Sequence, residues 1–171
     1  MMMGTNPLRD AYRILLDAAA TVADTGDTSP APPAGEWNAD QILAHIASVD
    51  AGIIAAAYAV ASGANTTYDN RTSLDTWTIE RVIALAGDNV GLRDRIRLQG
   101  DALCTLSEQV LSETELDTLV PTLLLSADNL QVDQPVPLRA LISGLAEDHL
   151  PRHAEQLLAL LPEDAVVAAT T

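Results

Sequence analysis

Three histidines are the residues of this 171-residue chain whose type and spacing could do chemistry. His149 and His153 lie four residues apart in the segment LAEDHLPRHAEQLLALL, which has the apolar spacing of an amphipathic helix. Side chains at i and i+4 lie one turn apart on the same helix face, where two imidazoles can bind one metal ion. His45 lies three residues after Ile42 and four before Val49, so it also faces inward on its own predicted helix. The sequence therefore predicts three core-facing histidines on two helices.

Each of these histidines also has an interpretation without a metal. A single inward histidine such as His45 is usually a core residue with a hydrogen-bond partner. Pro151 lacks the N–H that would bond the carbonyl of Glu147, so it either aims the two neighbouring rings or is simply a tolerated kink. The conjunction favours a metal, because three buried imidazoles without partners are costly and one divalent ion satisfies all three lone pairs. Three neutral ligands also leave a coordination position open, as in catalytic zinc sites.

The elements that must position these histidines are mostly helical. Apolar periodicity predicts helices over residues 6–24, 38–62, 76–111 and 137–161, with Asn38 and Gln41 forming a capping box at the start of the second. Gly87, Gly91 and Gly100 weaken the third helix and allow it to bend. The segment LVPTLLLSADNLQVDQPVPL between the third and fourth helices predicts two short extended pieces around the turn SADN. We expect an all-α fold, a four-helix bundle with a short extended hairpin before the last helix. One domain is expected over residues 1–165, followed by a frayed tail over 166–171.

Composition and charge narrow the class of partner. The chain is 48% hydrophobic and carries a net charge of −15, with a pI near 4.2. Such a charge repels phosphate backbones and anionic lipids, so we expect neither nucleic acid nor membrane as a partner. The apolar stretch over residues 42–61 contains His45 and Asp50 and is rich in alanine, which predicts a buried helix rather than a membrane span. The single cysteine, Cys104, and the lack of a leader pattern favour the cytoplasm.

Two segments resemble the motifs of a known family. EWNADQILAHIASVD is similar to the second-helix motif of DinB-like four-helix-bundle proteins, with Trp37 eight residues before His45. EDHLPRHAEQLLAL is similar to their fourth-helix motif, in which His149 and His153 are followed closely by Gln156. The order and length of the segments also resemble this family over nearly the whole chain.

The resemblance implies a metal triad of His45, His149 and His153. It also implies an up-down bundle, a divalent metal that varies between zinc, nickel and others, and frequent homodimers. We expect zinc or nickel in this chain. Members of the family include thiol-dependent enzymes, among them mycothiol-dependent maleylpyruvate isomerase and transferases that use low-molecular-weight thiols. We therefore expect a mycothiol-type transferase or isomerase, whose partners are a small-molecule thiol and a small electrophile.

A chemical role follows for several further residues. An open metal position lowers the pKa of a bound thiol and makes it a nucleophile. Arg152 and Arg71 are candidates for holding a carboxylate of the thiol or its electrophile, although surface solvation is the simpler role for both. Glu147 and Asp148 are candidates for orienting a ligand ring from outside the metal's first shell.

Other readings remain open at this point. Trp37 and Tyr68 are candidate pocket walls, with plain packing as the alternative, and Cys104 is expected in the core rather than as a nucleophile. A metal-dependent hydrolase would place water where the thiol is proposed, and a non-catalytic metal-binding or interaction protein is the third class.

Overall fold

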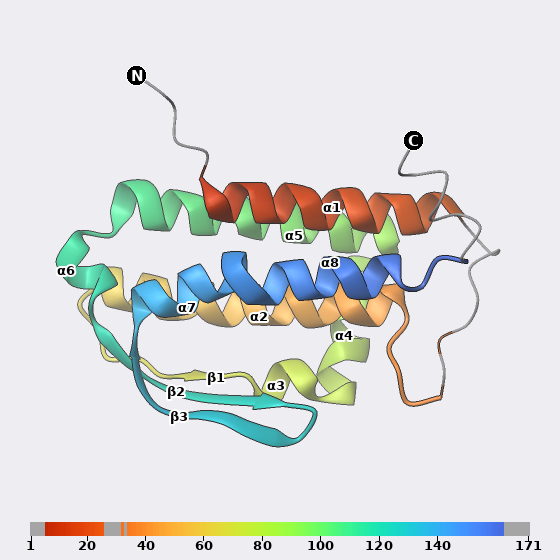
Figure 1. Cartoon of the computed structure of the whole chain (residues 1–171). Coiled ribbons are helices and arrows are strands. Elements are labelled where there is room, and N and C mark those ends of the chain that lie inside the picture. The colour runs from red at the N-terminus through yellow and green to blue at the C-terminus, as the bar shows by residue number, and fades with distance from the viewer. Residues whose placement is uncertain (1–5, 26–31, 33, 163–171) are drawn as a thin grey trace.

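The protein, described here from a computed structural model, is mostly helical with a small three-stranded sheet (Figure 1). The structure describes residues 6–25, 32 and 34–162, so the tail predicted over 166–171 lies outside the described residues. The long elements are α1 (Pro7–Thr25), α2 (Ala39–Ala61), α4 (Thr76–Ala86), α5 (Asn89–Thr105), β2 (Leu119–Ser126) and β3 (Asn129–Pro137). The short ones are β1 (Tyr68–Asp69), α3 (Arg71–Leu74) and α6 (Glu113–Leu116), together with a π-helical turn, η2 (Leu106–Val110). The last helix consists of α7 (Leu138–Gly144), the π-helical turn η3 (Leu145–His149) and α8 (Leu150–Leu158).

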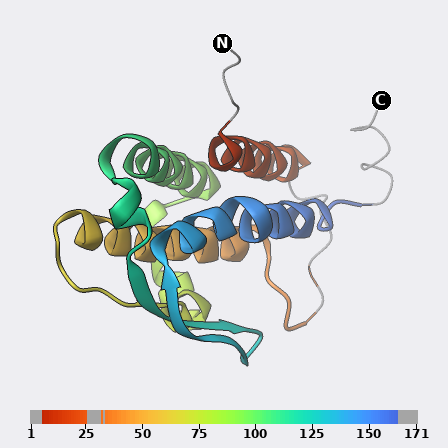
Figure 2. The same ribbon diagram turned by 60° about the vertical axis from the view of Figure 1, so that its left-hand side comes forward.

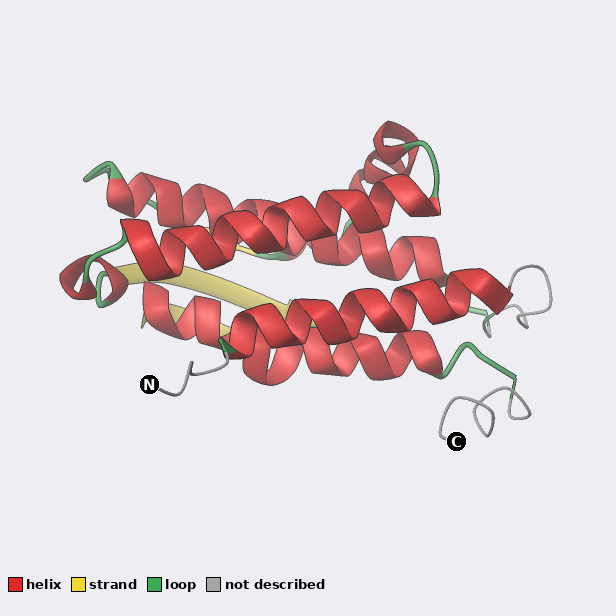
Figure 3. Ribbon diagram, turned by 90° about the horizontal axis from the view of Figure 1, so that it is seen from above, coloured by secondary structure: helices red, strands yellow, loops and turns green. Residues whose placement is uncertain are grey.

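Helices α1, α2, α5 and the last helix lie side by side around the core (Figures 1 and 2). Helix α1 packs against α5 and α8, and α2 packs against α4, α5 and α8. Figure 3 shows the same helices from above, with the sheet passing beneath them. The largest fully buried side chains come from every one of these segments, namely Leu15, Ile42, Leu43, Ile46, Leu92, Ile96, Leu103, Leu138, Leu150 and Leu157. Because each segment buries one apolar face, the four stripes combine into a single core.

Helix α2 begins as its sequence predicts. The Asn38 side chain accepts a hydrogen bond from the Gln41 N–H at 2.9 Å, and the Gln41 side chain accepts one from the Asn38 N–H at 2.9 Å. This capping box satisfies two donors at the first turn. By length and composition α2 is the one helix of the described residues that is apolar enough to cross a membrane, and 61% of its most apolar window is buried inside the protein.

The prediction of one helix over residues 76–111 is wrong. The chain breaks between α4 and α5, where Gly87 has φ +89° and ends α4. The carboxylate of Asp88 then accepts a hydrogen bond from the Gly91 N–H and begins α5. A glycine with positive φ ends one helix and an aspartate N-cap begins the next, and apolar periodicity detects neither. The apolar stripe continues through the break because both helices pack against α2.

The predicted hairpin is confirmed and is longer than expected. Strands β2 and β3 pair antiparallel from Leu119↔Pro137 to Ser126↔Asn129, around a two-residue turn in which Ala127 and Asp128 have positive φ. That turn matches the right-handed twist of a hairpin. Strand β1 pairs parallel with β2, so the sheet order is β1-β2-β3.

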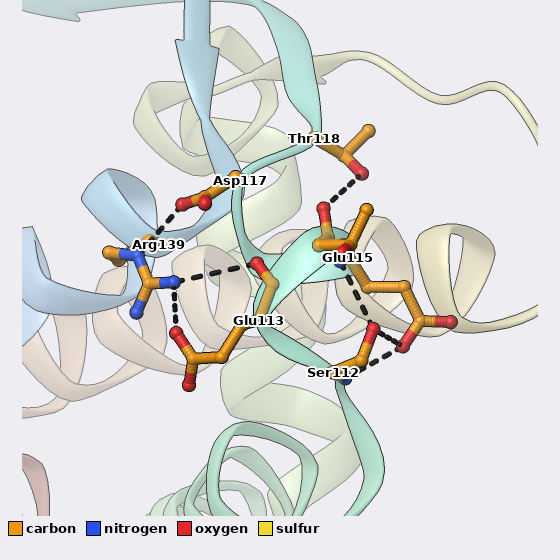
Figure 4. A network of polar contacts seen from close by, with 7 residues as sticks. Ser112, Glu113, Glu115, Asp117, Thr118 and Arg139 are labelled. Carbon is orange, nitrogen blue, oxygen red and sulfur yellow. Dashed lines mark hydrogen bonds and ion pairs between the residues drawn. The ribbon is translucent and has the colours of Figure 1, made fainter.

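A surface network fixes the start of the last helix (Figure 4). Arg139 donates from Nε to Asp117 at 3.0 Å and from Nη2 to the Glu113 carboxylate at 2.6 Å. Ser112 and Glu115 form a capping box on α6, and the Leu138 N–H donates to the Thr118 carbonyl. The ion pairs are exposed, so each contributes little to stability. They nevertheless hold the segment that leads into the two histidines of the last helix.

Candidate metal centre

The last helix carries His149 and His153 across a π-helical turn. The Leu150 N–H donates to the Leu145 carbonyl, five residues back, and α8 begins there with Pro151 in its first turn. Pro151 has no N–H for the carbonyl of Glu147, so the helix takes up one extra residue at this point. The buried stripe accordingly passes from Leu145 to Leu150 rather than to His149. Consequently His149 is only partly buried, whereas His153 is buried.

The structure brings the three predicted histidines together. His45 from α2, His149 from η3 and His153 from α8 each offer a ligand atom, and these atoms all lie within 4.8 Å of one another. The Nε2 atoms of His45 and His149 are 3.2 Å apart. The ring centroids are 5.3 Å (His45–His149), 4.9 Å (His45–His153) and 4.6 Å (His149–His153) apart. Three rings from two helices thus converge on one point.

Two of the rings have a fixed orientation because their Nδ1 atoms have partners. His45 Nδ1 lies 2.8 Å from the Ser73 carbonyl oxygen, which can only accept, so Nδ1 carries the proton. His153 Nδ1 lies 2.7 Å from Oε1 of Gln156 and likewise donates. In both neutral rings Nε2 is then the atom with the free lone pair. Such outer contacts orient the histidines of metal sites.

Burial keeps these imidazoles neutral. It lowers the pKa of His45 to about 4, against the weaker opposing effect of the Ser73 hydrogen bond. The pKa of His149 falls well below the ordinary value, through burial first and then through the neighbouring His153 and His45. Burial also lowers the pKa of His153. Near neutral pH the cluster therefore presents lone pairs rather than charges, the state in which imidazole binds metals.

The donor set fits a divalent metal ion. Two imidazole nitrogens that share a tetrahedral zinc ion at about 2.0–2.1 Å lie roughly 3.3 Å apart, and the His45–His149 pair is already at a similar separation. The buried Nδ1 of His149 has no hydrogen-bond partner among the described residues, and the polar contact of this ring is that of its Nε2 with Nε2 of His45. The three histidines form the whole cluster, without a carboxylate or thiol ligand from the part of the chain that the structure describes. Three protein ligands leave a position for an exogenous one.

The candidate residues around the triad have other partners. Arg71 donates from Nε and Nη2 to the Asp69 carboxylate, and Arg152 donates to Asp148 one helical turn away. Glu147 is exposed. The contacts that orient the rings come instead from Gln156 and from the backbone of Ser73. Gln156 can be found in the sequence, since it lies three residues after His153 on a helix, but a backbone carbonyl 28 residues from His45 leaves no signal.

The two proposed pocket walls differ. The ring of Trp37 lies 5.0 Å from that of His45 at a tilt of 42°, so this side chain does border the cluster. Tyr68 is 5% exposed and packs on α2 at Gly52, where a Cβ atom would lie 2.9 Å from the ring. Tyr68 therefore belongs to the core.

Cys104 is buried in the core, as predicted, and burial raises the pKa of its thiol. It also borders a cavity of about 290 Å³ between α1 and α5, which contains three arginines, Arg9, Arg13 and Arg97. Each of these arginines lies within 3.8 Å of an aspartate, and none of the triad residues lines this cavity. The arginine-lined space is thus separate from the histidine cluster.

Comparisons with known proteins do not identify a family for this chain. No family model, no curated protein and no solved structure matches the chain.

Proposed function

We propose that this chain is a DinB-like four-helix-bundle metalloprotein in which His45, His149 and His153 hold one divalent ion, zinc or nickel. The observation that carries the proposal is the convergence of three neutral imidazoles from two helices, two of them buried and His149 partly buried, with Nδ1 of two rings already donating to protein acceptors. The resemblance of the motifs around Trp37, His45 and Gln156 to that family supports the same reading.

The proposed activity is transfer of a low-molecular-weight thiol, of the mycothiol type, to a small electrophile. A divalent ion with an open position supplies Lewis acidity, which lowers the pKa of a thiol or a water taken from solution. The chain's contribution is to keep three rings neutral by burial and to point the lone pairs of at least two of them at one place. Trp37 borders this place with an aromatic face, which suits the apolar part of a small substrate.

To bind a substrate carboxylate, Arg152 and Arg71 must release the aspartates with which they now form ion pairs. Arg152 is 56% and Arg71 63% exposed, and both pair with aspartates at the surface. Such exposed ion pairs are weak, so a substrate carboxylate can compete for the guanidinium group. A homodimer in the cytoplasm remains part of the proposal, from the resemblance and from the single cysteine.

The test begins with the metal content of protein purified without an affinity tag. We expect about one zinc or nickel ion per chain. Protein reconstituted with cobalt is then mixed with mycothiol, bacillithiol, glutathione or cysteine, and a sulfur-to-metal charge-transfer band is expected with at least one of them. The same thiol should react faster with an electrophile in the presence of the protein, and His153→Ala should abolish the gain.

The outcomes separate the classes of function. No band and no rate gain with any of the four thiols, together with metal-dependent cleavage of an ester or amide, would make the protein a hydrolase. Metal at full occupancy without either activity would make it a non-catalytic metal-binding protein. Purified protein that neither contains nor takes up a divalent ion would refute the metal site itself.

A further inference from the structure

The sheet is connected to the metal centre through Asn70. The parallel pairing of β1 with β2 covers only Tyr68↔Thr122 and Asp69↔Leu123, after which the Asn70 N–H donates to the Leu123 carbonyl at 3.2 Å. The Asn70 side chain then continues the pattern. Its Nδ2 donates to the Leu125 carbonyl at 2.9 Å, and its Oδ1 accepts from the Leu125 N–H at 2.8 Å. The amide thus replaces a peptide group in the sheet while the backbone turns into α3.

The backbone of Asn70 also holds the residue that contacts His45. Its carbonyl accepts from the Ser73 hydroxyl at 2.6 Å and from the Ser73 N–H at 3.1 Å. Ser73 is 3% exposed, and its own carbonyl accepts the Nδ1 proton of His45 at 2.8 Å. An unbroken chain of hydrogen bonds therefore runs from β2 through Asn70 and Ser73 to the first histidine.

The short helix cannot hold this carbonyl by itself. Helix α3 has four residues, and a single turn in isolation is unstable because its few hydrogen bonds do not offset the backbone entropy lost. Its other side-chain anchor is the Asp69–Arg71 pair, which lies at the surface where ion pairs contribute little. Helix α3 packs on α2 and α4, and the Asn70 side chain supplies the hydrogen bonds that tie its start to β2.

The Ser73 carbonyl determines which nitrogen of His45 is free. While it accepts from Nδ1, the lone pair of His45 is on Nε2 and points toward His149. If α3 moves away, the ring loses its acceptor, and rotation or the other tautomer removes that lone pair from the cluster.

We infer that Asn70 is a positioning residue for the metal centre, acting through Ser73 on the orientation and tautomer of His45. The inference rests on the proposed metal site. It gives the three-stranded sheet a function, because β2 is the strand to which Asn70 ties the start of α3.

The experiment compares Asn70→Ala and Ser73→Ala with a matched control. Asn129→Ala also removes a side-chain amide that donates to a backbone carbonyl of the hairpin, that of Ala127, but it has no link to His45. Zinc affinity is measured by competition with a chromophoric chelator. Loss of a contact that orients a metal ligand weakens binding about 10- to 100-fold, so we expect this loss for Asn70→Ala. Ser73→Ala keeps the carbonyl and should show a smaller loss, whereas Asn129→Ala should stay within about twofold.

A second measurement distinguishes positioning from general destabilisation. Long-range ¹H–¹⁵N NMR spectra of the metal-free protein report the tautomer of each histidine ring. We expect the Nδ1–H form of His45 in the natural sequence and in Asn129→Ala, and a mixture of tautomers in Asn70→Ala. Unchanged His45 signals in Asn70→Ala, or zinc affinity reduced equally in Asn70→Ala and Asn129→Ala, would overturn the inference.

His45→Ala separates this inference from the proposed function. If His45→Ala loses zinc while Asn70→Ala and Ser73→Ala keep it, the metal site stands and the positioning role is wrong. If His45→Ala binds zinc as tightly as the natural sequence, the metal site is wrong, and the positioning role falls with it.

Discussion

Helix α2 contributes a residue to two polar clusters, and the clusters differ in the partners that their polar atoms have. His45 faces two other histidines, and every neutral ring offers an acceptor without an ionisable partner of opposite charge in the cluster. Five residues later, Asp50 is fully buried and accepts the hydroxyl of Tyr12 at 2.7 Å. The first cluster collects lone pairs that suit an external cation, whereas the second pairs the Tyr12 hydroxyl with one oxygen of Asp50 and leaves Oδ2 without a partner among the described residues.

The difference shows how a buried polar group can be assigned a role. Tyr12 reaches Asp50 because Gly100 of α5 has no side chain, and a Cβ there would lie 2.8 Å from the phenol ring. This pair ties α1 to α2, so its role is structural. The histidine cluster contains no oppositely charged group, and outer contacts orient two of its rings so that their lone pairs are on Nε2. Convergence of three neutral rings without a charged partner is what favours a ligand site.

The largest expected effect is loss of the metal from the first cluster alone. His45→Ala should reduce zinc affinity by about a hundredfold or more, because two imidazoles do not hold the ion well. Tyr12→Phe should leave the affinity unchanged. Elemental analysis after dialysis against a weak chelator measures both variants side by side. Retention of a full equivalent of metal by His45→Ala would contradict the triad.

Removal of the metal should destabilise the protein without unfolding it. The core is built from the apolar stripes of the long helices and does not depend on the ion. A ligand present at 100 times its Kd stabilises by about 2.7 kcal/mol, so chelation should lower Tm by several degrees. Circular dichroism of the chelated protein should still show the helical spectrum. Complete loss of helix would make the metal structural, as in zinc fingers.

Much of this arrangement could be predicted from the sequence, and the rest depended on features that periodicity does not encode. The capping box at Asn38, the hairpin and the meeting of the three histidines follow from spacing and turn chemistry. The break at Gly87 was missed because the apolar stripe runs through it. The π-helical turn was missed as well, although Pro151 and the five-residue step from Leu145 to Leu150 indicate it.

Of the two contacts that orient the histidine rings, one can be predicted from the sequence and the other cannot. Gln156 lies within one helical turn of His153, so helical spacing can find it. Ser73 acts through its backbone from a distant segment, and β1, which places that segment, pairs over only two residues. Long-range backbone contacts of this kind leave no pattern of side chains to read.

A smaller effect is expected from breaking the second cluster. Tyr12→Phe removes the only donor that the described residues offer to the fully buried Asp50 carboxylate, and an unsatisfied buried acceptor costs about 1–3 kcal/mol of the free energy of unfolding. Tyr58→Phe is the matched control, since Tyr58 is 67% exposed and the same substitution there should have little effect. Urea denaturation followed by circular dichroism measures both. Equal stability of the two variants would mean that the Tyr12–Asp50 bond adds nothing.

The effect that compares the clusters most directly is on the pH dependence of stability in the metal-free protein. Burial raises the pKa of Asp50 to about 7, against the opposing hydrogen bond from Tyr12, so the folded state binds this proton more tightly than the unfolded state. The stability it contributes is complete below pH 3.8 and is lost as the pH rises toward 7.

His45 has the opposite sign, because burial lowers its pKa from 6.5 to about 4. Its contribution is complete above pH 6.5 and is lost as the pH falls toward 4. The two slopes therefore oppose each other between about pH 4 and 6.5, each by at most about 1.4 kcal/mol per pH unit. Asp50→Asn removes one of them, so the stability of this variant should rise with pH across that window more steeply than that of the natural sequence. Urea denaturation in chelator at pH 4.5, 5.5 and 6.5 measures the slopes, and parallel curves for the two proteins would show that Asp50 titrates alike in the folded and unfolded states.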